Sequence, residues 1–80
     1  MQKIRQDRQL GQNIRALRIA SHMTQDQVIA KLQIAGCETT RSIYAQIECG
    51  DYNIRVSELV ALKKIFGVDY NAFFAGMEDA

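Results

Sequence analysis

The sequence contains no proline, and it has neither a low-complexity tract nor an internal repeat. Its segments are therefore expected to be helices separated by glycines and short polar turns. No stretch shows the two-residue alternation of a half-buried strand. A chain of 80 residues buries only about 60% of its unfolded surface, which supports a single hydrophobic core. The sequence predicts one all-α domain.

Long apolar runs are also missing. None approaches the roughly 20 residues that a membrane-spanning helix needs. The first residues, MQKIRQDRQ, lack the apolar stretch of a signal peptide. We therefore expect a cytoplasmic protein without a membrane partner. Because that compartment is reducing, Cys37 and Cys49 are expected to be free thiols.

The sequence also lacks the groupings of side chains that catalysis and metal binding require. Its single histidine, His22, has no second histidine or close cysteine pair at zinc-binding spacing. It contains no nucleophile with a nearby base, no pair of carboxylates on one helical face and no glycine-rich phosphate loop. The sequence therefore predicts neither an enzyme nor a cofactor or a metal site.

Net charge is small, at +1, but it is unevenly distributed. Residues 1–22 hold five basic side chains and one acidic side chain, whereas residues 23–80 hold five basic and eight acidic ones. The first part of the chain is therefore basic and the remainder acidic. Such a basic region either binds an anionic partner such as nucleic acid or is simply a solvated surface.

Apolar residues recur at helical spacing in five segments, which predicts five short helices. The positions that define the five apolar stripes are Leu10, Ile14 and Leu17; Val28, Leu32 and Ala35; Tyr44 and Ile47; Leu59, Leu62, Ile65 and Phe66; and Phe73 with Phe74. Each stripe is expected to face the core.

Capping residues are expected to set the ends of these helices. Thr24 and Gln27 have the form of a capping box at the start of the second helix. The expected caps of the third, fourth and fifth helices are Thr39 or Thr40, Ser57 and Asp69. Glycine readily adopts the left-handed conformation that ends a helix, which predicts helix ends at Gly36, Gly50 and Gly67.

Four runs in this order resemble the Cro and phage-repressor (xenobiotic-response-element type) helix-turn-helix family: LGQNIRALR, MTQDQVIAKL, TTRSIYAQIECG and VSELVALKKIFGVDYNAFF. The resemblance extends from Leu10 to Phe74. It implies a compact five-helix, lambda-repressor-like fold in which the second helix crosses the DNA backbone and the third enters the major groove. The implied function is a sequence-specific transcriptional regulator, first of all a repressor, that binds double-stranded DNA.

In this family the third helix reads bases, which implies that role here for Arg41, Ser42 and Gln46. An arginine pairs with guanine, and a glutamine with adenine, through two hydrogen bonds each. Ile43 either touches a thymine methyl group, as a further base contact, or packs against a neighbouring turn.

The resemblance also implies contacts that position the protein on DNA and one that stabilises the fold. Phosphate contacts are implied for Gln25, Thr40, Asn53 and Arg55. Family members commonly pair an arginine at the end of the first helix with a glutamate near the end of the third. Here this implies a structural ion pair between Arg18 and Glu48, with a phosphate contact as the alternative for Arg18.

The sequence departs from the family between the second and third helices, where residues 33–38 make the connection longer than usual. We expect the second helix to gain roughly one turn, about 5.4 Å, before Gly36 ends it. This leaves open the angle at which the third helix approaches DNA. The expected DNA-binding domain is residues 10–75, between a basic arm or helix extension at 1–9 and a frayed tail at 76–80.

A symmetric operator implies a homodimer, because one reading helix covers only a few base pairs. Phe73, Phe74 and Met77 are expected to form the dimer interface, unless the two phenylalanines complete the monomer core. A different function is also compatible with the resemblance. Small proteins similar to this family act as antitoxins, which would make the partner a protein toxin.

Overall fold

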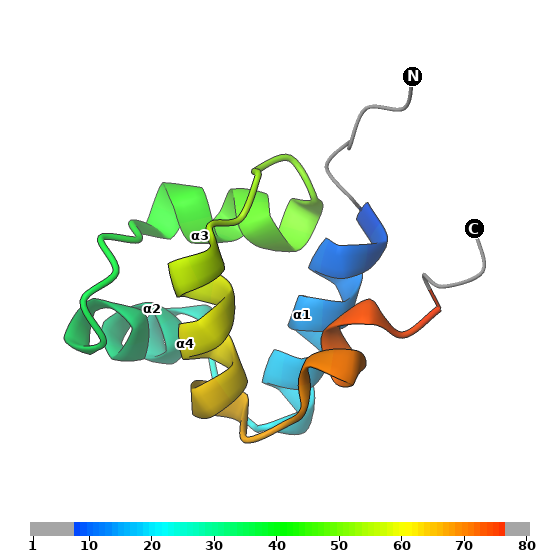
Figure 1. Cartoon of the computed structure of the whole chain (residues 1–80). Coiled ribbons are helices and arrows are strands. Elements are labelled where there is room, and N and C mark those ends of the chain that lie inside the picture. The colour runs from blue at the N-terminus through cyan, green and yellow to red at the C-terminus, as the bar shows by residue number, and fades with distance from the viewer. Residues whose placement is uncertain (1–7, 77–80) are drawn as a thin grey trace.

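The computed structural model describes residues 8–76, in which four α-helices are followed by a short 3-10 helix (Figure 1). The elements are α1 (Arg8–Ala20), α2 (Gln25–Ile34), α3 (Arg41–Cys49), α4 (Val56–Phe66) and η1 (Tyr70–Phe74). No strand occurs in this range, which confirms the all-α prediction. The fifth predicted segment forms only the 3-10 helix, so four α-helices are described where five helices were expected. No helix within these residues is both long and apolar enough to cross a membrane.

Capping residues begin and end α2 and α3 as predicted. The Thr24 hydroxyl accepts a hydrogen bond from the amide of Gln27 at 3.1 Å, and the Gln27 side chain accepts one from the amide of Thr24 at 2.8 Å. Thr40 caps α3, because its hydroxyl accepts from the amide of Ile43 at 3.1 Å. Gly50 ends α3 with a left-handed φ of 82°. These short-range patterns place both helices.

The start of α4 differs from the prediction that Ser57 caps it. The helix begins after Arg55, whose amide donates to the Glu58 carboxylate at 2.9 Å. The other Glu58 oxygen accepts from the Thr39 hydroxyl at 3.0 Å, and both of these side chains are buried. A carboxylate at the third helical position satisfies a free amide at the helix start. Glu58 therefore begins α4 and ties it to the segment before α3.

The connection between α2 and α3 spans residues 35–40. α2 continues to Ile34, and Gly36 follows with the predicted left-handed conformation, at a φ of 96°. The side-chain amide of Gln33 donates to the carbonyl oxygen of Thr39 at 3.1 Å. This bond folds the connection back along the last turn of α2.

The core lies where the helices meet. α1 packs against α3 and η1, and α2 packs against α3 and α4 (Figure 1). The predicted stripes supply most of the buried apolar side chains, although Ala35 lies past the end of α2 and is exposed. The buried set is Ile14, Val28, Ile29, Leu32, Tyr44, Ile47, Ala61, Leu62, Phe66 and Phe73.

Phe73 belongs to this core and is not available to a dimer interface, so of the two roles that the sequence left open for it the structure supports the core one. Its side chain is fully buried, and its ring centroid lies 6.4 Å from that of Phe66. The side-chain amide of Asn13 donates to the carbonyl oxygen of Phe73 at 2.8 Å and so fastens η1 to α1. Phe74 is 37% exposed, and Met77 lies outside the described residues.

The backbones of α1 and α3 touch at Gly11. A Cβ atom on this residue would lie 2.6 Å from the carbonyl oxygens of Ile47 and Glu48. A separation that short is a steric clash with backbone atoms, so only glycine lets the two helices approach this closely. The contact holds the second half of α3 against α1.

Candidate functional site

One face of α3 is buried and the opposite face is exposed. Tyr44, Ile47 and Glu48 point into the molecule. Three predicted base-reading residues, Arg41, Ser42 and Gln46, are all exposed. Ser42 and Gln46 are four positions apart and share a helical face, whereas Arg41 lies at the first position of the helix. The structure therefore exposes all three side chains on the surface of α3, away from the core.

Ile43 is half-buried, as expected for an apolar residue beside an already filled inward face. It packs against the core and lines a pocket next to the start of α3. Packing against a neighbouring segment is the role that these contacts support. The thymine contact stays a prediction.

The predicted ion pair between Arg18 and Glu48 is present and buried. Arg18 Nε donates to Glu48 Oε2 at 2.7 Å, and Arg18 Nη2 donates to Glu48 Oε1 at 3.2 Å. The two side chains are only 12% and 4% exposed. Arg18 Nη1 donates in addition to the carbonyl oxygen of Met23 at 3.0 Å. All three guanidinium nitrogens are thus engaged inside the protein, which favours a structural role over a phosphate contact.

Gln25, at the start of α2, joins the same network. Its amide nitrogen donates to Glu48 Oε1 at 3.0 Å, and the residue is half-buried. The sequence offers no sign of this bond, because the two residues are on different helices. Gln25 is therefore oriented by Glu48, and α1, α2 and α3 meet at a single carboxylate.

These surroundings shift pKa values in directions that keep the pair charged. Burial acts to raise the pKa of Glu48, but hydrogen bonds led by that from Arg18 outweigh it, and the pKa lies below its ordinary 4.5. The hydrogen bond to Glu48 raises the pKa of Arg18, although burial opposes it. Burial raises the pKa of Tyr44, whose buried hydroxyl has no hydrogen-bond partner within residues 8–76. The tyrosine is therefore neutral beside a charged pair.

A second ion pair lies on the surface and links α3 to α2. Arg41 Nη1 lies 2.7 Å from Asp26 Oδ1, and the two side chains are 66% and 70% exposed. Asp26 belongs to the first turn of α2, and Arg41 is the first residue of α3. No local pattern connects positions on separate helices, so this pair could not be predicted. It brings the first turns of the two helices to one surface.

The remaining predicted phosphate contacts flank α3. Thr40 precedes the helix and is exposed, while its hydroxyl also serves as the cap. Asn53 and Arg55 follow the helix and are exposed in the segment that leads to α4. Exposed polar groups therefore stand before and after the exposed face of α3.

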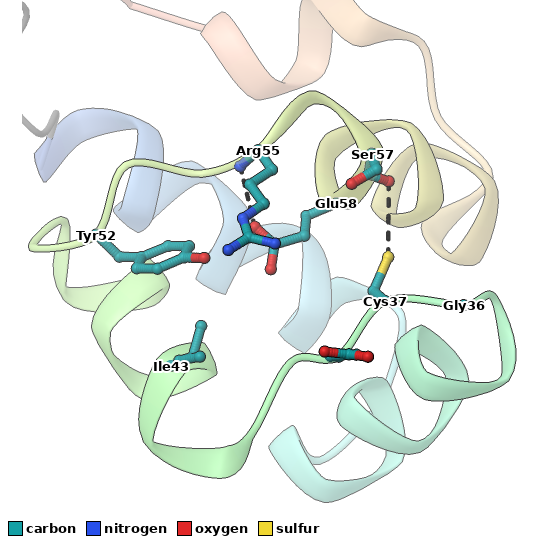
Figure 2. A pocket seen from close by; sticks show the side chains of 8 residues that line it. Gly36, Cys37, Ile43, Tyr52, Arg55, Ser57 and Glu58 are labelled. Atoms are coloured by element: carbon teal, nitrogen blue, oxygen red, sulfur yellow. Dashed lines mark hydrogen bonds between the residues drawn. The ribbon is translucent and has the colours of Figure 1, made fainter.

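A pocket of about 320 Å³ opens beside the start of α3 (Figure 2). Both Glu58 oxygens there are hydrogen-bonded, and the thiol of Cys37 donates to the carbonyl oxygen of Ser57 at 3.8 Å. No group of three candidate metal ligands occurs within residues 8–76. The polar groups of the pocket thus mainly fasten chain segments to one another. Its lining residues are Gly36, Cys37, Glu38, Ile43, Tyr52, Arg55, Ser57 and Glu58.

Both cysteines are free thiols, as predicted from the sequence. Cys37 is partly buried at the pocket, and Cys49 is exposed at the end of α3. Neither belongs to the exposed polar face that Arg41, Ser42 and Gln46 form.

Comparison with protein-family models, curated proteins and solved structures finds no match to this chain. The geometry of α2 and α3 and the chemistry of their exposed side chains are what indicate the function.

Proposed function

We propose that this protein is a cytoplasmic, sequence-specific DNA-binding regulator of transcription, with α3 as the helix that enters the major groove. The observation that carries the proposal is the exposed surface of α3, which carries Arg41, Ser42 and Gln46. A helix fits the major groove, which is about 12 Å wide. Arginine and glutamine carry the paired donors and acceptors that recognise guanine and adenine. Tyr44 and Ile47 anchor the opposite face in the core, so the reading side chains stand on a rigid support.

The packing of α2 against α3 supports a helix-turn-helix in which α2 lies across the DNA backbone. The first turn of α2 is close to the first turn of α3, as the Arg41–Asp26 distance requires. Free amides at the start of a helix favour an anion such as phosphate. The connection at residues 35–40 is longer than a tight turn, and it sets the angle between the two helices.

Gln25 fits a phosphate contact without leaving the buried network. A glutamine side-chain amide has two N–H groups, and Gln25 uses one of them on Glu48. The second N–H can donate to a phosphate oxygen. Glu48 would then orient Gln25 toward the backbone, while Thr40, Asn53 and Arg55 contact phosphates around α3.

Arg41→Ala is the substitution that tests the reading role. We expect the affinity for the preferred duplex to fall by about 1 to 3 kcal/mol, with lost preference at one base pair, because the guanidinium no longer bonds to guanine. The preferred duplex is found by selecting bound sequences from a random pool. Titration against that duplex and its single-base variants then measures the loss. An unchanged preferred site would contradict the assignment of α3 to the groove.

Arg55→Gln is the matched control, since it removes a charge at a position assigned to phosphate. We expect this variant to bind all duplexes more weakly by the same factor, so that the base preference is kept. The slope of log affinity against log salt concentration should fall by about one, because one phosphate contact is lost. If wild-type protein retained no duplex at any salt concentration, the DNA-binding proposal would fall. Copurification with a small protein would then favour the antitoxin alternative.

We also propose that two protomers bind one symmetric DNA site. With Phe73 in the core, the exposed aromatic side chains of η1 are Tyr70 and Phe74, at 39% and 37% exposure. Such side chains are suited to a contact with a second copy. Sedimentation of the protein with a selected duplex is expected to give two protomers per duplex, and Phe74→Ala is expected to weaken that assembly. One protomer per duplex at every protein concentration would contradict the proposal.

A further inference from the structure

The surface ion pair between Arg41 and Asp26 joins two elements of the proposed DNA-binding surface. Its distance is 2.7 Å, and both side chains are mostly exposed. An exposed pair of this kind contributes little to the stability of a fold, because water and salt screen it. Stability therefore does not account for a guanidinium held at the start of α3 by a carboxylate on another helix.

The geometry leaves one edge of the guanidinium open. Within residues 8–76, the bond from Nη1 to Asp26 is the only side-chain hydrogen bond that Arg41 makes. The Nε and Nη2 atoms form the opposite edge of the planar group, and together they present two parallel N–H donors. This is the donor spacing that the O6 and N7 acceptors of guanine require.

The backbone at Asp26 is firmly placed. It lies in the first turn of α2, between Thr24 and Gln27, whose reciprocal hydrogen bonds start that helix. A carboxylate on a rigid helix end restricts the long arginine side chain to one region. The Asp26 carboxylate also repels phosphate groups, and so it opposes a shift of Arg41 toward the DNA backbone. A contact with the backbone would carry no sequence information.

We propose that Asp26 is a specificity-determining residue that positions Arg41, so that the Nε and Nη2 edge meets guanine in the major groove. The inference rests on the proposed function, since it assigns a role within the same DNA surface. The negative charge of Asp26 lowers the affinity for DNA in general. In return, the contact between Arg41 and guanine contributes more binding free energy, because a side chain that is already restrained loses less conformational freedom on binding. This gain applies only to the duplex with guanine at that position.

The test compares Asp26→Asn, Arg41→Ala and the double variant on two duplexes. One duplex carries the selected site. In the other duplex, the G·C base pair that Arg41 reads is replaced by a different base pair. For D26N we expect the preference for the selected duplex to fall about three- to tenfold, while binding to the exchanged duplex stays equal or becomes tighter. In the R41A background, adding D26N should not change the preference, because the residue that Asp26 positions is gone.

Glu38→Gln is the matched charge control. Glu38 is also exposed and lies shortly before α3, but it makes no hydrogen bond to Arg41. We expect E38Q to keep the full preference for the selected duplex. The melting temperature of D26N should stay within a few degrees of that of the wild type, since the pair is exposed.

Three different results would overturn the inference, and they can be told apart. If R41A loses the base preference while D26N keeps it, Asp26 has no positioning role and the DNA-binding proposal stands. If wild-type protein selects no duplex, the proposed function fails and the role of Asp26 falls with it. An equal loss of preference in D26N and E38Q would also count against positioning, since charge alone would explain it.

Discussion

Replacing Glu48 with glutamine is expected to lower the free energy of unfolding at pH 7 by about 3 to 5 kcal/mol. The substitution keeps the size of the side chain but removes the negative charge that faces Arg18. Because the arginine side chain is only 12% exposed, water cannot replace the lost counter-charge. Urea denaturation followed by circular dichroism measures the loss, provided that the denaturant slope stays at its wild-type value.

Replacing both partners with apolar residues separates the effect of charge from that of packing. The double variant R18M/E48M leaves no charge buried, so its stability should return to within about 1 to 2 kcal/mol of the wild type. Glu38→Gln, which changes an exposed carboxylate, should alter stability by no more than about 0.5 kcal/mol. If E48Q unfolded at the same urea concentration as the wild type, the buried pair would not be what holds α1 to α3.

The Glu48 carboxylate also makes the stability of the folded protein depend on pH. The pKa of Glu48 in the folded protein lies below its ordinary 4.5. Its contribution to stability is therefore fully present above the unfolded pKa and is lost as the pH falls through the folded pKa. Wild-type protein should lose stability below pH 4.5 more steeply than E48Q, which has no carboxylate at this position. If the free energy of unfolding fell equally steeply with pH in the wild type and in E48Q, the lowered pKa of Glu48 would be contradicted.

Replacing Gly11 with alanine is the second substitution with a large expected effect. In an isolated helix alanine is favoured over glycine by about 1 kcal/mol, so a local view predicts a more stable protein. The added Cβ would lie 2.6 Å from two backbone carbonyl oxygens of α3. Overpacking costs about 1 to 3 kcal/mol or more, and backbone atoms cannot turn aside as a side chain would. We therefore expect a net loss of at least about 2 kcal/mol.

Gln12→Ala is the matched control, because Gln12 is the exposed neighbour of Gly11 in α1. It tests helix propensity without the contact to α3, and its effect should stay within about 0.5 kcal/mol. Thermal and urea denaturation of both variants measure the difference. A stabilised G11A protein would show that α1 and α3 do not meet at this residue. At temperatures where G11A is folded, its displaced α3 should also bind the selected duplex less tightly.

Local signals in the sequence predicted most of the helices. The capping box at Thr24 and the left-handed Gly50 were correctly assigned, because each depends on residues no more than a few positions apart. Ser57 was incorrectly assigned as a cap, since Glu58 performs that task with help from Thr39, which is distant in the sequence. Capping by a side chain is local, but the choice between competing side chains depends on what else they contact.

The candidate site likewise has features that could be predicted from the sequence and features that could not. The exposed face of α3 follows from its periodicity, and the ion pair of Arg18 with Glu48 followed from the family resemblance. The bond from Gln25 to Glu48 and the pairing of Arg41 with Asp26 had no sequence signal. The position of a side chain relative to another helix depends on the distance and angle between the helices, which no short window of sequence contains.

The sequence by itself determined the all-α class, the main capping positions and which face of each helix is apolar, because these follow from spacings within one element. Only the tertiary structure decided that Phe73 completes the core, that Gly11 brings α1 onto α3, and that one carboxylate, Glu48, joins three helices. Those outcomes depend on atoms brought together by folding from distant parts of the chain. Their energies arise from burial and close contact, which exist only once the helices have packed.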